Sequence, residues 1–188
     1  MTSDALGAIA RLSSRERERV GAGRGGADSM SNGDKQAALR DVTSALGAFG
    51  APYALIGGVA VGIRSGVIRA TEDTDLAIRS SVSRRELIDA LVSSGFELRG
   101  EHEHSVNFRH ESGEPVQVVF DPEFDSMIDR AESVDLGVGA IRVVTTDDLI
   151  EMKERAAADP ARRASKALRD RADVALLRGD VPDPDEGW

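Results

Sequence analysis

Two aspartates are the residues of this sequence whose type and spacing point most directly to chemistry. Asp73 and Asp75 lie two residues apart in a stretch, 73–78, whose pattern predicts a β-strand. Because side chains alternate along a strand, both carboxylates are expected on the same face. Neighbouring carboxylates repel each other unless a cation lies between them, and Mg²⁺ binds one or two carboxylates together with phosphate oxygens and water. The pair therefore predicts a divalent-metal site suited to an in-line phosphoryl displacement.

A pair of glycines precedes the aspartates. Gly57-Gly58 ends a predicted strand and opens a predicted short helix. Glycine lets the backbone approach a phosphate closely, and the first N–H groups of a helix are unpaired. Each feature alone is common, and an acidic hairpin edge is the structural alternative. The combined order is more specific: strand, Gly-Gly, short helix and then Arg69-x-Thr71-x-Asp73-x-Asp75.

The elements that must position these residues form an α+β pattern, with a mixed β-sheet flanked by helices and a C-terminal helical pair. Strands are predicted at 53–56, 73–78, 96–101, 105–110, 116–121 and 141–144. Helices are predicted at 35–49, 59–65, 83–93, 123–131, 146–157 (capped by Thr146) and 161–177. In the last helix the predicted buried stripe is Leu168, Ala172, Ala175 and Leu176, with Lys166, Asp170 and Asp173 on the polar side.

Composition excludes several classes of protein. The chain of 188 residues has no Cys, so it has no disulfides, no thiolate nucleophile and no Cys-ligated zinc. No apolar run approaches the roughly 20 residues of a membrane span, and the N-terminus lacks the order of a signal peptide. We therefore expect a cytoplasmic protein without a membrane partner.

Charge and glycine content differ along the chain and predict four regions. We expect a flexible N-terminal arm at 1–34, an α/β core at 35–145, helices completing the site at 146–178 and an acidic tail at 179–188. Residues 35–150 hold 11 basic and 19 acidic side chains, whereas residues 151–178 hold 8 basic and 5 acidic ones. This balance argues against general coating of nucleic acid but allows local contact with a phosphate-bearing ligand.

The glycine and aspartate motifs together resemble the DNA polymerase β-like nucleotidyltransferase superfamily. The branch that they most resemble is the nucleotidyltransferase toxins of bacterial toxin–antitoxin and abortive-infection pairs, the AbiEii and Men-type group. Two later segments are similar to the same branch. The stretch 148–153 resembles its helix with a functional lysine, and 169–173 resembles its basic-Asp-x-x-Asp helix. The resemblance covers residues 38–178.

The resemblance implies nucleotide transfer from an NTP, with Mg²⁺ (or Mn²⁺ instead) held by Asp73 and Asp75. The residues implied to bind the nucleotide are Gly57, Gly58, Arg69, Thr71 and Lys153. Lys153 and either Asp170 or Asp173 would complete the catalytic site. The implied acceptor is an RNA hydroxyl, at a tRNA 3′ end, or a protein hydroxyl, and the implied partner is a cognate antitoxin. Without the resemblance, Lys153 can be interpreted as a surface lysine. Lys166 and Asp170 can likewise be interpreted as an ion pair on a solvated face of the helix.

One position departs from the superfamily pattern. A later strand often carries a third carboxylate, as Val-Asp-Val, where this chain has Val116-Gln117-Val118. Glutamine neither acts as a base nor binds Mg²⁺ as a carboxylate does. Asp121, on the same predicted strand face, is a candidate third metal ligand. Otherwise water or Asp75 takes the proton of the attacking hydroxyl, or the activity is lost.

Two other functions remain open. An antibiotic adenylyltransferase on the same fold would suit an acidic body that attracts cationic aminoglycosides. A non-catalytic nucleotide- or partner-binding module would explain Gln117. His102, His104 and His110 are residues of the type that binds transition metals, but His102 and His104 are expected instead in an exposed hairpin.

Overall fold

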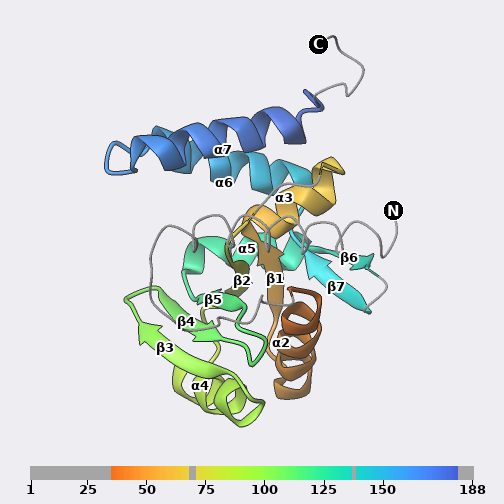
Figure 1. Cartoon of the computed structure of the whole chain (residues 1–188), viewed down its shortest axis with the longest axis vertical. Coiled ribbons are helices and arrows are strands. Elements are labelled where there is room, and N and C mark those ends of the chain that lie inside the picture. Colours follow the sequence, from red (N-terminus) through yellow and green to blue (C-terminus); the bar gives the residue numbers. More distant parts are fainter. Residues whose placement is uncertain (1–34, 68–70, 137–138, 182–188) are drawn as a thin grey trace, which may run out of the picture.

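The computed structural model describes residues 35–67, 71–136 and 139–181. Its helices are α2 (Lys35–Phe49), α3 (Gly57–Ser65), α4 (Arg84–Ser93), the 3₁₀ turn η1 (Pro122–Phe124), α5 (Asp125–Arg130), α6 (Thr146–Ala158) and α7 (Ala164–Leu177). Its strands are β1 (Tyr53–Ile56), β2 (Thr74–Ile78), β3 (Glu97–Glu101), β4 (Ser105–Arg109), β5 (Pro115–Val119), β6 (Glu132–Asp135) and β7 (Ala140–Val143). The α+β class is confirmed (Figure 1).

The strands form one mixed seven-stranded sheet in the order β3-β4-β5-β2-β1-β7-β6. β2 lies at its centre, antiparallel to β1 and parallel to β5. The register pairs Asp75 with Ile56 on one side and with Gln117 on the other. The centre of the sheet therefore places Asp75 next to the end of β1 and beside Gln117.

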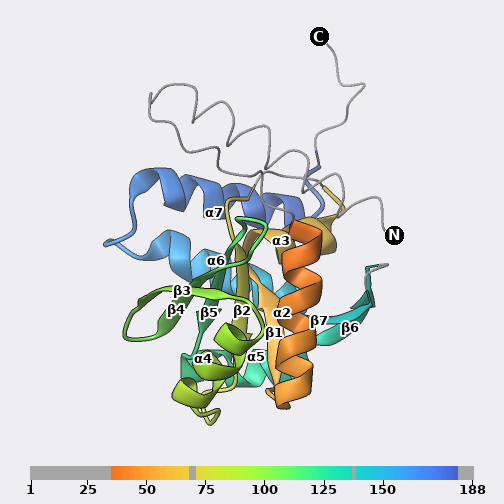
Figure 2. The same cartoon turned by 60° about the horizontal axis from the view of Figure 1, so that its bottom comes forward.

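Burial alternates along β4 and β5, which shows that this half of the sheet has one covered and one open face. Val106 and Val118 are fully buried, whereas Asn107 and Gln117 are partly exposed. The helices α2 and α4 lie over the covered face (Figure 2), and their buried leucines belong to the same hydrophobic core. Asp75 on β2 is paired in register with Gln117 on β5, so the two side chains lie on the same face of the sheet, which is the open face.

The two C-terminal helices form a pair that packs on α3 (Figure 1). α6 begins after Thr145, whose hydroxyl accepts a hydrogen bond from the backbone N–H of Asp148 (3.2 Å). The predicted cap at Thr146 is thus wrong by one residue, because Thr145 is the last residue with an extended backbone. None of the described helices has both the length and the apolar character needed to cross a membrane.

The face predicted to be buried in α7 is wrong. Leu168 is 63% exposed, whereas the buried residues of the helix are Asp170, Asp173, Val174 and Leu177. These four still follow helical spacing, but two of them are carboxylates whose partners come from outside α7. Hydrophobicity alone therefore predicts the wrong side of α7 as the buried one.

Some predictions fall outside the described residues, namely those on 1–34, on Arg69 and on 182–188. The boundary between an α/β core ending at 145 and helices from 146 remains a prediction. The strand β6 was not predicted, because its sequence, Glu-Ser-Val-Asp, has a single apolar residue.

Candidate functional site

The turn between β1 and α3 brings Gly57 into contact with Asp75. Gly57 has φ +69°, a conformation that L-residues rarely adopt. A methyl group on its α-carbon would overlap the Asp75 carboxylate oxygen and lie 2.8 Å from its Cγ. The helix α3 begins at Gly57 itself, and no side chain caps its first turn. The carboxylate therefore lies against a helix N-terminus whose N–H groups can receive an anion.

The electrostatics of Asp75 show which charged groups surround it. Burial raises its pKa and the negative charge of Asp73 adds to the rise, so that the pKa of Asp75 is about 7. Three lysines oppose this rise in the pKa of Asp75: Lys153 of α6, Lys35 of α2 and Lys166 of α7. The site thus combines two carboxylates with cations from three separate helices.

The two aspartates fit a hard divalent cation. They carry adjacent negative charge at a partly buried position, which a cation would relieve. Among the described residues, no group of three or more His, Cys, Asp or Glu side chains could hold a metal alone. A metal at Asp73 and Asp75 would therefore need oxygens from a ligand, as Mg²⁺ does when it binds a nucleotide phosphate.

Lys153, Asp170 and Asp173 form a buried charge cluster between α6 and α7. The Nζ of Lys153 lies 3.0 Å from Asp170 Oδ1 and 2.9 Å from Asp173 Oδ2. Arg162 closes the cluster, with its Nε 2.8 Å and its Nη2 2.7 Å from Asp170 Oδ2. The exposed fractions are 8% for Lys153, 2% for Asp170 and 1% for Asp173. Asp170 therefore pairs with Lys153 and Arg162 rather than with Lys166 on a solvated face.

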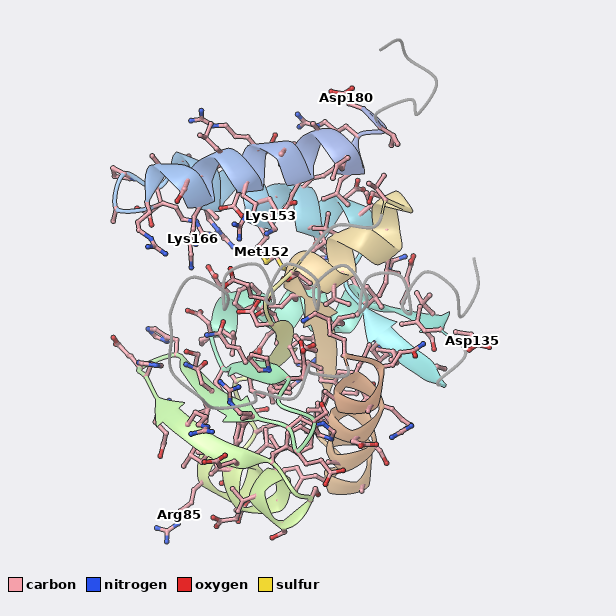
Figure 3. The ribbon with its side chains drawn as sticks, viewed as in Figure 1. Arg85, Asp135, Met152, Lys153, Lys166 and Asp180 are labelled. Carbon is pink, nitrogen blue, oxygen red and sulfur yellow. The ribbon has the colours of Figure 1, made fainter. Side chains whose placement is uncertain are left out.

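This cluster borders the aspartate pair through α3, which packs against both α6 and α7. Figure 3 shows Lys153 and Lys166 extending from the helical pair toward the sheet. Both lysines also lower the pKa of Asp75, which places their charges near that carboxylate. The structure thus brings Lys153, Asp170 and Asp173 to the same side of the molecule as Gly57 and Asp75.

The position of the absent third carboxylate is occupied by Gln117. It lies beside Asp75 in the β2–β5 register, and its amide Nε2 donates a hydrogen bond to Asn107 Oδ1 (3.0 Å). Asp121 comes four residues later, about 13 Å along an extended chain that runs away from Asp75, and its carboxylate accepts a hydrogen bond from the N–H of Glu123 (3.0 Å). Binding of the metal by Asp121 stays a prediction.

Of the other predicted nucleotide-binding residues, Gly58 is buried in the first turn of α3. Thr71 is also buried, and its hydroxyl donates to the backbone carbonyl of Asp73 (3.4 Å). This bond shapes the turn that leads into β2. Arg69 lies outside the described residues.

Three further charged residues lie near the site and were not predicted from the sequence. Lys35 and Glu114 form a fully buried ion pair at the start of α2 and of β5. Arg162 completes the cluster at Asp170. A buried ion pair joins residues far apart in the chain, so neither spacing nor periodicity reveals it.

The histidines agree with the expected hairpin. His102 and His104 are exposed at the β3–β4 turn, and Arg84 donates hydrogen bonds to the backbone carbonyls of this turn. His110 is instead buried, with its Nε2 3.1 Å from Asp41 Oδ2, and it links the β4–β5 hairpin to α2.

Comparisons with known proteins bear on the fold. No protein-family model matches the chain, and no curated protein sequence matches it. Among solved structures, the lincosamide antibiotic adenylyltransferase LnuA, bound to lincomycin, is 14% identical with a TM-score of 0.56, covering 79% of this chain and 98% of that one. An antigenic nucleotidyltransferase-like protein from Paracoccidioides brasiliensis is 22% identical with a TM-score of 0.54, covering 80% and 78%.

A third structure, ANT(2″)-Ia in complex with adenylyl-2″-tobramycin, is 17% identical with a TM-score of 0.54, covering 78% of this chain and 90% of that one. At these identities the likeness shows the fold. The chain has the nucleotidyltransferase fold, as the motifs predicted, and none of these neighbours identifies the toxin branch.

Proposed function

We propose that this protein is a metal-dependent nucleotidyltransferase that moves a nucleotide from an NTP to a hydroxyl group. The observation that carries the proposal is the contact between Asp75 and Gly57, which places the carboxylate of Asp75 against the uncapped first turn of α3. Anion-binding N–H groups next to cation-binding carboxylates can hold a phosphate and its metal together. The nucleotidyltransferase fold agrees with this assignment.

Each group then has a role. Asp73 and Asp75 would hold Mg²⁺, or Mn²⁺, which when bound neutralises phosphate charge and stabilises the attacking and leaving oxygens. Gly57 and Gly58 offer backbone N–H groups to the phosphates, and the resemblance assigns Arg69 to the phosphates as well. Thr71 holds the turn that carries Asp73. Lys153, Asp170 and Asp173 complete the wall of the site between α6 and α7.

In the proposed reaction, the acceptor hydroxyl oxygen attacks the α-phosphorus in line with the bond to the β-phosphate. A P–O bond to the acceptor forms, the bond between the α-phosphorus and its bridging oxygen breaks, and pyrophosphate leaves. Gln117, beside Asp75 on the open face, can accept a hydrogen bond from the acceptor hydroxyl through its amide oxygen but cannot take its proton. The proton therefore passes to water on this open face.

The surface of α7 favours an RNA acceptor. Arg163, Lys166 and Arg169 are exposed, and the described part of the chain gives them no ion-pair partner. Such a row of cations attracts phosphates and repels a cationic antibiotic. We therefore propose the hydroxyl of an RNA, such as a tRNA 3′ end, as the acceptor and a protein hydroxyl as the next choice. The toxin role and its antitoxin partner are proposed on the resemblance alone.

An antibiotic adenylyltransferase is the second candidate. One solved neighbour is described as a lincosamide antibiotic adenylyltransferase, and another is in complex with adenylyl-2″-tobramycin. The net charge of −9 would attract a cationic aminoglycoside. Resistance of cells that express the protein would favour this candidate, whereas growth arrest would favour the toxin.

The test is incubation of the purified protein with each α-labelled NTP, Mg²⁺ and total RNA, then with cell lysate and then with aminoglycosides and lincosamides. The variant is Asp73→Asn/Asp75→Asn. The matched control is Asp89→Asn/Glu111→Gln, which removes two exposed carboxylates away from the site. We expect label in RNA with the wild type and the control but not with the site variant.

Label in a protein or an antibiotic would keep the reaction and change the acceptor. If the folded wild type labels no acceptor of any class, the proposed enzyme is wrong and the non-catalytic binding module takes its place.

A further inference from the structure

Three lysines lower the pKa of Asp75, and the three differ in their other contacts. Lys35 is fully buried in its ion pair with Glu114. Lys153 is buried between Asp170 and Asp173. Lys166 is exposed, and the described residues offer it neither an ion pair nor a side-chain hydrogen bond. Lys166 is thus the one of the three whose ammonium is available to a ligand without breaking a buried contact.

Moving Lys153 onto a phosphate would be unfavourable. Its Nζ has two carboxylate partners within 3.0 Å, and its side chain is 11% exposed. Removing it would leave Asp173 and part of Asp170 as buried carboxylates with fewer cationic partners, which is strongly destabilising. Lys153 therefore links α6 to α7, and the carboxylates of Asp170 and Asp173 already balance its charge.

The geometry of α7 directs Lys166 toward the site. Lys166 precedes Asp170 by four residues and Asp173 by seven, so the three lie on one side of the helix. In the second half of α7 this side is buried. In the first half, none of residues 164–169 is buried, so the same side is open to solvent. Figure 3 shows Lys166 extending from this open half toward the sheet.

We propose that Lys166 binds the β- and γ-phosphates of the NTP and that Lys153 is a positioning residue that fixes α7 against α6. This inference rests on the proposed nucleotidyltransferase function. A lysine at the end of a flexible stem acts as a mobile point charge, which suits a phosphate group that enters and leaves as pyrophosphate. A metal-bound triphosphate remains anionic, so an unpaired cation opposite the aspartate pair completes its charge balance.

The test measures binding rather than turnover. The probes are the α,β-methylene analogues of ATP and GTP with Mg²⁺, compared with AMP and GMP, by titration calorimetry. The variants are Lys166→Gln, Lys166→Arg and Lys153→Gln. The matched control is Arg171→Gln. Arg171 is also exposed and follows Lys166 by five residues, but it lies on the side of α7 that lines a groove with α6.

We expect Lys166→Gln to weaken triphosphate binding about tenfold or more, since a charged hydrogen bond is lost, and to leave monophosphate binding unchanged. Lys166→Arg should restore most of the affinity, and Arg171→Gln should match the wild type. Lys153→Gln should lower the melting temperature while the ratio of triphosphate to monophosphate affinity stays near that of the wild type.

Equal losses in Lys166→Gln and Arg171→Gln would overturn the inference, because they would indicate general charge attraction. Wild-type affinity in Lys166→Gln would overturn it as well, and the proposed function would stand if Asp73→Asn/Asp75→Asn still abolished binding. If the wild type binds no triphosphate, the proposed function and this inference both fall.

Discussion

The carboxylate of Asp75 occupies the space that a side chain at Gly57 would need. The contact arises because β1 pairs with β2 so that Ile56 lies opposite Asp75, and the chain then turns at Gly57 with a positive φ. One glycine therefore satisfies two requirements, a left-handed backbone and a gap for a carboxylate. This explains physically why a glycine and an aspartate 18 positions apart in the chain work as one unit.

The first prediction concerns Gly57→Ala. The substitution strains the backbone, which costs about 1–3 kcal/mol of unfolding free energy, and its methyl group displaces the Asp75 carboxylate. We expect Mn²⁺ binding, followed by electron paramagnetic resonance, to be lost in the variant that remains folded.

The matched control is Gly47→Ala. Gly47 lies exposed in α2 with no atom within 4 Å of an added Cβ, so the substitution should stabilise the helix by about 0.5–1 kcal/mol and leave Mn²⁺ binding intact. Unchanged Mn²⁺ binding in Gly57→Ala would show that the Asp75 contact is not needed for the metal.

The second prediction concerns Lys153→Met. Loss of the ammonium leaves two buried carboxylates short of a partner, so we expect the free energy of unfolding in urea to fall by about 3–5 kcal/mol. The comparison is Glu154→Ala, which breaks the exposed Arg178–Glu154 pair (2.6 Å) and should cost about 1 kcal/mol or less. Similar losses in both variants would indicate that the buried cluster contributes no more than a surface ion pair.

The third prediction is a pH dependence at Asp148. Burial acts to raise its pKa, but the hydrogen bonds from Arg130 and Thr145 outweigh burial and hold the pKa below the usual value. A carboxyl with a lowered folded-state pKa stabilises the fold above its unfolded-state pKa, about 4, and this stabilisation is lost as pH falls through the folded-state pKa. We expect Asp148→Asn to cost about 1–2 kcal/mol at pH 7 and less as the pH falls below 4.

The control for Asp148 is Asp147→Asn, the neighbouring exposed carboxylate in the first turn of α6. It should change the free energy of unfolding by about 0.5 kcal/mol at most. A difference between Asp148→Asn and the wild type that stays constant from pH 7 to pH 3 would contradict the prediction.

The fourth prediction concerns Gln117→Glu, which places a third carboxylate beside Asp75. Without metal the added charge repels the aspartates and lowers the melting temperature. With Mg²⁺ the extra ligand strengthens binding, so the metal-induced rise in melting temperature should exceed that of the wild type. Asn107→Asp adds the same charge one strand further from Asp75 and should show a smaller rise. Equal rises in the two variants would argue against a metal at Asp75.

The sequence predicted well those parts of the fold that depend on local pattern. The strand 53–56 was confirmed with its bounds, and the helix predicted at 83–93 is observed as α4 (Arg84–Ser93). The open-face position of Asp75 follows from simple alternation along β2. These features are fixed by neighbours in the chain, so a single sequence contains the information.

The parts that were missed depend on contacts between distant residues. The buried side of α7 is set by Lys153 and Arg162, which meet Asp170 only after α6 and α7 fold back on each other. The residue beside Asp75 is set in a similar way, since the register of β5 against β2 places Gln117 there. Neither relationship has a signature in periodicity or spacing.

The order of the sheet has a consequence for how the protein behaves at high concentration. Its two outer strands, β3 and β6, are rich in charge, which they carry at Glu97, Arg99, Glu101, Glu132 and Asp135. An outer strand exposes backbone groups on which another molecule can add a strand, and charged side chains oppose such addition. The polar sequence of β6, which prevented its prediction as a strand, therefore also opposes pairing of this edge with a strand of another molecule. We expect hydrophobic substitutions in β3 and β6 to promote aggregation before substitutions elsewhere in the sheet.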